Sequence, residues 1–245
     1  MKKLFQILKW GMLLALMLVI LAFTNKKQEQ KLVQLDQINI EESEDRFVTK
    51  ALILEHIRKH NFDFDSVMLS SFYLNNLEVN LLNHPSVKKV EVYSSQEGLL
   101  SINLQQRKAV VRIKTSSSDY YLDEDGLEMP LSKNYTPRVL VVSGDVNPSH
   151  HSDIFSFIKT INKNEFWESQ IIQLHFEADE VIVIPRVGTQ KIHFGILTNI
   201  HEKLDNLYQF YKQVMPVKGW QTYSDISVKY NNQIVCIKNK NYGRK

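Results

Sequence analysis

The strongest feature of the hydrophobic pattern is an apolar run, Trp10–Phe23, that follows three lysines and precedes more than 200 mostly polar residues. With the apolar residues before Lys9, whose side chain can snorkel, the segment reaches about 20 residues, enough for a helix to cross a bilayer. The positive flank predicts a cytoplasmic N-terminus. We therefore expect a cytoplasmic tail at residues 1–6 and a transmembrane signal-anchor helix at residues 7–24. A cleaved signal peptide is the alternative, but Ala22 offers only a poor cleavage site.

After a short polar spacer, the pattern predicts the order strand, helix, helix, strand, strand over residues 32–107. In the last strand Leu100, Ile102 and Leu104 alternate with polar residues, which indicates one buried and one wet face. The acidic stretch Glu41–Asp45 is expected to be a solvated loop. The other expected elements are a strand at Leu32–Ile40, a helix with its N-cap at Thr49, a helix at Leu74–Leu82 ended by Pro85, and a turn at Ser95–Gly98.

Residues 108–240 predict a mostly antiparallel β domain with flanking helices, so the fold class as a whole is α+β. The expected strands are Tyr120–Leu122 and Leu127–Met129 as a hairpin, Val139–Val142, Ile171–Phe176, Val181–Ile184, one around Ile192 and Phe194, and Asp225–Tyr230 and Gln233–Lys238 joined at Asn231-Asn232. The expected helices are Asp153–Ile161 and a longer one with an apolar stripe from Ile196 to Val214, ended by Pro216.

The charge distribution and the cysteine content exclude some classes of function and of covalent structure. The net charge is +3, but residues 1–31 hold six Lys and one Glu (+5), so residues 32–245 carry −2. The basic charge therefore belongs to the N-terminal segment, and nucleic-acid binding is not expected. The only cysteine, Cys236, excludes an intramolecular disulfide and is expected to be a buried thiol.

Three groups of polar residues resemble metal or catalytic sites in part of their pattern. His56 and His60 have metal-ligand spacing on a helix, but a zincin needs Glu where Ile57 stands and no third ligand is evident, so both are expected to be solvent-exposed. The pair His150-His151 is expected in a loop. The acidic run from Asp123 to Asp125 lacks the spacing of a calcium loop and is expected to be a hairpin turn.

The sequence contains no nucleophile elbow, P-loop, dinucleotide-binding glycine motif or CxxC pair. We therefore expect no enzyme activity, cofactor, metal or small-molecule substrate. A membrane-anchored periplasmic hydrolase is an alternative, but it would need a convergent catalytic set that the sequence does not offer.

Several segments of the chain resemble segments of one known protein family and follow one another in the same order. Residues 83–92 (NHPSVKKVEV) resemble the step from the second helix into a strand of a POTRA domain, and residues 100–107 (LSINLQQR) its closing strand. Residues 120–126 (YYLDEDG) resemble the hairpin that follows, residues 139–144 the strand opening a second β domain, and residues 223–230 (YSDISVKY) a late strand. Behind one N-terminal anchor, this order resembles the FtsQ/DivIB family of bacterial cell-division proteins.

The resemblance implies a POTRA domain at residues 32–107, an FtsQ-type β domain at 108–240, and an essential scaffold of the divisome. Such a protein lies in the inner (plasma) membrane at the midcell septum, with its C-terminal domains extracytoplasmic. It links early cytoplasmic division proteins to septal peptidoglycan synthesis by binding FtsB-like and FtsL-like coiled-coil proteins and other Fts proteins. Ser227 and Lys229 depart from the Asp and Arg that are usual in the family's late strand.

The resemblance also implies a partner-binding site on the C-terminal strands, where a partner segment adds a strand to the sheet edge. The residues carried over by position are Lys229, Tyr230 and Asn232 as contacts, and Val235, Cys236 and Ile237 as the edge strand. An envelope-assembly protein with POTRA modules is the remaining alternative, but too few residues follow the module for a membrane β-barrel.

Overall fold

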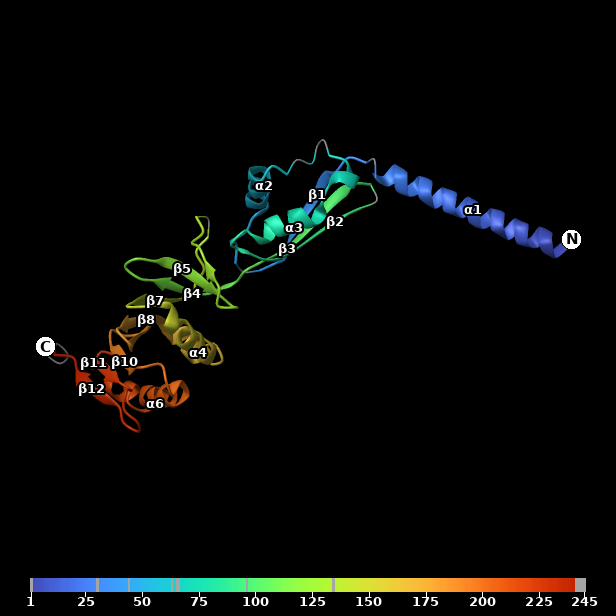
Figure 1. The fold of residues 1–245 in the computed structure, drawn as a ribbon. Helices are drawn as coiled ribbons and strands as arrows, with labels where there is room; N and C mark the ends of the chain where they lie inside the picture. The colour runs from blue at the N-terminus through green and yellow to red at the C-terminus, as the bar shows by residue number, and fades with distance from the viewer. Residues whose placement is uncertain are drawn as a thin grey trace. The chain divides into compact units, whose positions relative to one another are not determined.

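The computed structural model describes residues 2–29, 31–43, 45–62, 64, 67–95, 97–133 and 135–240. It divides into two compact units, Met1–Arg107 and Lys108–Lys245 (Figure 1). Helix α1, Lys2–Glu29, includes the segment expected to be a transmembrane helix. Among the residues whose side chains are described, no helix is both long and apolar enough to cross a membrane.

The rest of the first unit has the predicted order of elements. Its sheet has the strand order β1-β3-β2, in which β1 is parallel and β2 antiparallel to β3. A short 3₁₀ turn, η1, is the one element of this unit that the sequence did not suggest. The elements are β1 (Gln34–Ile40), α2 (Lys50–Lys59), η1 (Leu69–Ser71), α3 (Leu74–Leu82), β2 (Val87–Ser94) and β3 (Leu99–Gln106).

Capping and apolar spacing explain the two helices of this unit. The Thr49 hydroxyl accepts a hydrogen bond from the backbone N–H of Leu52 at 3.3 Å, which confirms the predicted N-cap. Ile53 and Ile57 of α2 and Leu77 and Leu81 of α3 are buried. These side chains stand at i and i+4 on one face of each helix, as expected for amphipathic helices packed on a core.

Two expectations about solvent exposure in this unit were wrong. Asp45 of the acidic stretch is buried, because Gln106 donates to its carbonyl at 2.6 Å and accepts from the Val48 N–H at 3.2 Å. Ser101, on the face of β3 expected to be wet, is also buried, because β3 is the central strand. Two residues of the predicted loops, Glu44 and Gln96, lie outside the described residues.

The described part of the second unit is built on a nine-stranded sheet with the order β12-β11-β10-β9-β8-β7-β4-β5-β6. Its strands are β4 (Ala109–Lys114), β5 (Asp119–Asp123), β6 (Glu128–Met129), β7 (Leu140–Gly144), β8 (Ile171–Glu177), β9 (Glu180–Pro185), β10 (Lys191–Gly195), β11 (Tyr223–Ser227) and β12 (Val235–Lys238). Its helices are η2 (Pro148–His150), α4 (His151–Ile161), α5 (Glu165–Gln170), α6 (Ile200–Gln213) and α7 (Met215–Lys218).

The sheet is mostly antiparallel, as predicted, but the pairs β4–β7, β7–β8 and β10–β11 are parallel. Parallel neighbours need a long crossover. Helices supply it in two of the three pairs, since α4 and α5 connect β7 to β8, and α6 and α7 connect β10 to β11, whereas β5 and β6 lie between β4 and β7. In Figure 1, α4 and α6 lie on the same side of these strands. Their buried faces form one core with the sheet, in which Phe157 of α4 meets Phe194 of β10 edge to face at 5.4 Å.

The hairpin predicted around residues 123–126 is present. Asp123 Oδ1 accepts hydrogen bonds from the backbone N–H groups of Asp125 at 3.0 Å and Leu127 at 2.8 Å. Gly126 has a φ of 80°, a left-handed conformation that glycine adopts without strain. The acidic run is therefore a turn whose first carboxylate is used by the backbone, as the sequence indicated.

Candidate partner-binding edge

Strand β12 forms one end of the nine-stranded sheet. Among the described strands it pairs only with β11, in antiparallel register, with Cys236 opposite Ile226 and Ile237 opposite Asp225. Its second edge therefore carries backbone N–H and C=O groups that no described strand pairs with, the arrangement to which another strand can be added.

The three predicted edge residues differ in exposure. Val235 and Ile237 are 46% and 59% exposed. Cys236 lies between them in sequence, packs against the core beside buried Ile226, and is half-buried. Burial raises the pKa of the Cys236 thiol, so the thiol stays protonated and unreactive near neutral pH. The sequence predicted a buried thiol, whereas Cys236 is only partly buried.

The three predicted contact residues lie outside the strands. The strand expected at Asp225–Tyr230 ends at Ser227, and the one expected to begin at Gln233 begins at Val235. Tyr230 is 55% exposed in the loop between them. Asn232, in the same loop, has a φ of 60°, which suits asparagine in a tight turn.

Lys229 is already engaged within the unit. Its ammonium forms an ion pair with Glu180 at the start of β9. Its aliphatic stem lies over Gly195, where an added Cβ would come within 3.2 Å of Lys229 Cγ. The backbone N–H of neighbouring Val228 donates to His193 O at 3.0 Å, which holds this end of the loop against β10.

Sequence reasoning missed a polar group that supports the edge. His193 Nε2 of β10 lies 2.8 Å from Asp225 Oδ1 of β11, and the Ser224 hydroxyl donates to Asp225 Oδ2 at 2.7 Å. The hydrogen bond to His193, then that to Ser224, lowers the pKa of the Asp225 carboxyl. These residues are 32 positions apart in the chain, so only the strand pairing, which periodicity does not give, could have revealed them.

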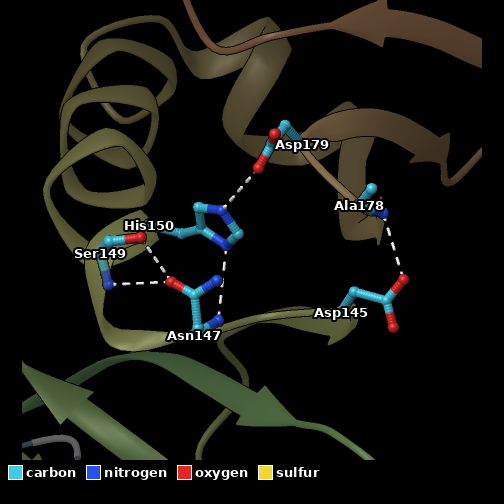
Figure 2. Close-up of polar contacts among 6 residues, drawn as sticks. All are labelled: Asp145, Asn147, Ser149, His150, Ala178 and Asp179. Carbon is cyan, nitrogen blue, oxygen red and sulfur yellow. Dashed lines mark hydrogen bonds and ion pairs between the residues drawn. The ribbon is translucent and has the colours of Figure 1, made fainter.

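A second polar group lies at the carboxyl end of β7 (Figure 2). His150 Nε2 is 3.4 Å from the Asp179 carboxylate, and its ring stacks on Phe176 with centroids 4.8 Å apart. Asp145 Oδ2 accepts from the backbone N–H of Ala178 at 3.1 Å. The prediction of a loop at His150-His151 was wrong: His150 ends η2, and His151 begins α4 and lies 3.0 Å from the Tyr120 hydroxyl.

His56 of α2 and His60 at its C-cap have more neighbours than the sequence indicated. His56 lies 5.2 Å from His84, between ring centroids, as well as 4.3 Å from His60. The sequence did not indicate that His84 lies beside this pair. Of the two expected to be exposed, His60 is exposed and His56 is half-buried. Within the described residues, no group of three or more His, Cys, Asp or Glu side chains has a geometry that could hold a metal ion.

A polar cleft of about 470 Å³ lies on the face of the first unit's sheet. Asn39 donates to Asn103 across it at 3.1 Å, and Lys89 and Glu91 form an ion pair at 2.7 Å on its rim. The hydrogen bond within that pair raises the pKa of Lys89 and lowers that of Glu91. Two pairs of polar side chains of the cleft thus bond to each other.

Comparison with known proteins identifies both units. Residues 35–105 match the model of a POTRA-like domain, and residues 108–237 match the family model described as FtsQ/DivIB, C-terminal related. None of the curated proteins matches the chain.

Among solved structures, the chain is similar to the major extracytoplasmic domain of the trans isomer of the bacterial cell division protein DivIB from Geobacillus stearothermophilus. The sequence identity is 11%, the TM-score is 0.31, and the match covers 45% of this chain and 96% of that one. The family model, which spans more than half of the 245 residues, carries the assignment. The chain is therefore a member of the FtsQ/DivIB family and has a role in bacterial cell division.

Proposed function

We propose that this protein is a non-enzymatic scaffold of the divisome. It joins early cytoplasmic division proteins to the proteins of septal peptidoglycan synthesis by binding FtsB-like and FtsL-like coiled-coil partners. Membership in the FtsQ/DivIB family supports the process, and the unpaired edge of β12 supports the mode of binding.

The partner adds an extended segment to β12. An added strand satisfies the N–H and C=O groups along the edge, which gives affinity with little dependence on sequence. Specificity then comes from side chains around the edge. Tyr230, Val235 and Ile237 are apolar or aromatic and about half exposed, and a tyrosine in such a position is among the residue types that dominate the binding energy of protein interfaces. Lys229 and Asn232 shape the adjoining loop.

Helix α1 holds the protein in the inner membrane, with the N-terminus in the cytoplasm and residues 32–240 on the other side of the membrane. The described large apolar side chains of α1, from Leu8 to Ile20, are each more than half exposed. Burying this apolar surface in lipid would stabilise the inserted helix by about 25 cal/mol per Å² of area removed from water. The lysines before the run favour this orientation.

The test combines localisation at midcell with co-purification of the coiled-coil partners. Ile237→Lys places a charge on the edge strand, and Tyr230→Ala removes the exposed ring; both side chains are more than half exposed, so the fold should tolerate the changes. We expect each variant to lose at least about tenfold in partner affinity, equivalent to ~1.4 kcal/mol. Val217→Lys is the matched control, since Val217 is 78% exposed on α7.

Partner binding by both edge variants at the level of the control would remove β12 as the docking site while keeping the scaffold role. A tagged protein spread evenly around the envelope of dividing cells would contradict the scaffold role itself.

A further inference from the structure

Three imidazole rings meet where α2 ends and where α3 turns into β2. The ring of His56 lies between those of His60 and His84, with centroid distances of 4.3 and 5.2 Å. His56 Nε2 lies 3.1 Å from the carbonyl oxygen of Asn80 in α3, so the neutral ring donates its proton there. His84 itself is half-buried.

His84 acts as a hydrogen-bond acceptor. The backbone N–H of Ser86 points at His84 Nδ1 over 3.2 Å. Since a backbone N–H can only donate, Nδ1 must be unprotonated and the ring proton must sit on Nε2. A doubly protonated ring cannot accept this bond. Ser86 is buried, so its N–H would be left without its acceptor inside the unit.

The segment 84–86 fixes the end of the first unit. The Arg107 guanidinium donates from Nη1 to Pro85 O at 2.8 Å, and its backbone N–H donates to Ser86 O at 2.9 Å. The N–H of Val87 closes the corner by donating to His84 O at 2.9 Å. Arg107 is the last residue of the first unit, so this corner anchors the point at which the chain passes to the second unit.

Among the charged groups on the elements around the corner, His56 opposes a proton on His84. Helix α2 contributes His56, Arg58 and Lys59 in its last turn, and His60 as its C-cap. The end of β3 contributes Arg107, while the carboxylate of Glu78 on α3 accepts from the Val92 N–H at 2.7 Å. Burial, and then the charge of His56, lowers the pKa of His84 below its ordinary value of 6.5.

We propose that residues 84–86 form a pH-sensitive latch: in acid, a proton added to His84 Nδ1 breaks the hydrogen bond from Ser86 and loosens the anchor of Arg107. The sign follows from linkage. Because the unfolded segment binds the proton more readily than the folded one, the latch is fully closed above about pH 6.5 and opens as the pH falls through the lowered value. Acidification would thus loosen the corner at residues 84–86 and its contacts with Arg107.

Amide hydrogen exchange of the full chain, with a chelator present to exclude metal binding, tests the latch. Protection is compared at pH 8 and pH 5 after correction for intrinsic exchange, in peptides covering residues 84–90 and 104–110. We expect protection to fall by roughly five- to tenfold at pH 5, the effect of losing one buried hydrogen bond. Unchanged protection in both peptides would overturn the proposal.

Two variants and a control separate the latch from general acid unfolding. His84→Asn keeps a side-chain oxygen that can accept from the N–H two residues on but does not titrate, so its protection should be equal at both pH values. His56→Gln removes the neighbouring charge and should move the midpoint of opening to higher pH. The His60 ring is exposed, and of the other two imidazole rings it contacts only that of His56. His60→Asn should therefore behave nearly as the wild type. A His84→Asn variant that opens in acid as the wild type does would refute the mechanism.

Discussion

At the scale of residues, the edge of the second unit depends on a polar contact between strands. Asp225 of β11 holds both His193 of β10 and its own neighbour Ser224, and its side chain is 27% exposed. β10 and β11 are parallel neighbours that a helical crossover connects in sequence. The contact between Asp225 and His193 therefore helps to hold β11 in place. In turn, β11 is the described strand on which β12 lies.

The contribution of Asp225 should depend on pH. Its hydrogen bonds lower the pKa of the carboxyl below the ordinary value of 3.8, so it stabilises the fold above that value and loses the effect as the pH falls through the lowered value. We expect Asp225→Asn to reduce the free energy of unfolding by about 1–2 kcal/mol at pH 6, and the difference from wild type to shrink towards pH 3. Urea denaturation of the full chain at both pH values measures this.

Asp179→Asn is the matched control for Asp225→Asn. Asp179 also faces a histidine, His150, but its side chain is 88% exposed and the contact is 3.4 Å long. Exposed pairs of this kind contribute little, so this variant should unfold like the wild type. An equal deficit for Asp225→Asn at pH 6 and pH 3 would show that the carboxylate charge is not what stabilises β11.

At the scale of elements, the start of α6 rests on a buried lysine. The helix begins at Ile200, after Asn199 in a left-handed conformation with φ 52°, and not at Ile196, which is 54% exposed. Lys203 reaches back to donate to Phe194 O at 3.0 Å and Ile196 O at 2.8 Å. Burial lowers its pKa. Its position on the buried side of α6 departs from the apolar stripe that the sequence suggested.

Replacing this lysine should destabilise the second unit. Lys203→Met keeps the length of the side chain but removes the ammonium donor from Phe194 O and Ile196 O, of which Ile196 O keeps the N–H of Thr198. The loss should lower the free energy of unfolding by about 1–3 kcal/mol. Lys212→Met on the exposed face of the same helix is the control and should change it by less than about 0.5 kcal/mol. Thermal and urea unfolding of the two variants provide the comparison. Equal free energies of unfolding for Lys203→Met and Lys212→Met would mean that water satisfies the two carbonyl groups as well as the Lys203 ammonium does.

Sequence periodicity revealed most elements but not those whose pattern is short or interrupted. The first unit was predictable because α2 and α3 bury residues four positions apart and β3 keeps Leu100, Ile102 and Leu104 buried at every second position. Strand β4 was missed because Val110 and Val111 are adjacent and mask its alternation, and α5 because six residues are too few to show a helical period. Strand β11 ends at Ser227, although the N–H of the next residue, Val228, still bonds to His193. The positions of Lys229 and Tyr230 in the loop that follows could therefore not be predicted from the local pattern alone.

The site was predictable to a similar degree. The sequence and its family resemblance indicated an edge strand at Val235–Ile237, and β12 lies at the end of the sheet. What the sequence could not indicate is the commitment of Lys229 to Glu180, since the two residues are 49 positions apart and the contact depends on how β9 and β10 pair. Whether these six residues bind a partner stays a prediction.

At the scale of the whole molecule, the division at Arg107 and Lys108 leads us to expect two units that fold independently. The large core cluster draws all its members from residues 108 onward, including both helices that cover the sheet. A domain of this size has enough buried apolar surface to fold alone. We expect the segment 108–240, expressed by itself, to unfold in one cooperative urea transition, with the midpoint that the second unit shows in the full chain.

Since the β12 edge belongs wholly to this unit, the isolated segment should also bind the coiled-coil partners with an affinity within about threefold of the full chain, less than 1 kcal/mol. Sedimentation or calorimetry with the purified partner segment measures this, and Ile237→Lys in the same fragment serves as the negative control. A fragment that folds but does not bind would place part of the docking surface in residues 1–107. A fragment that exposes its core and unfolds without a cooperative transition would show instead that the two units stabilise each other.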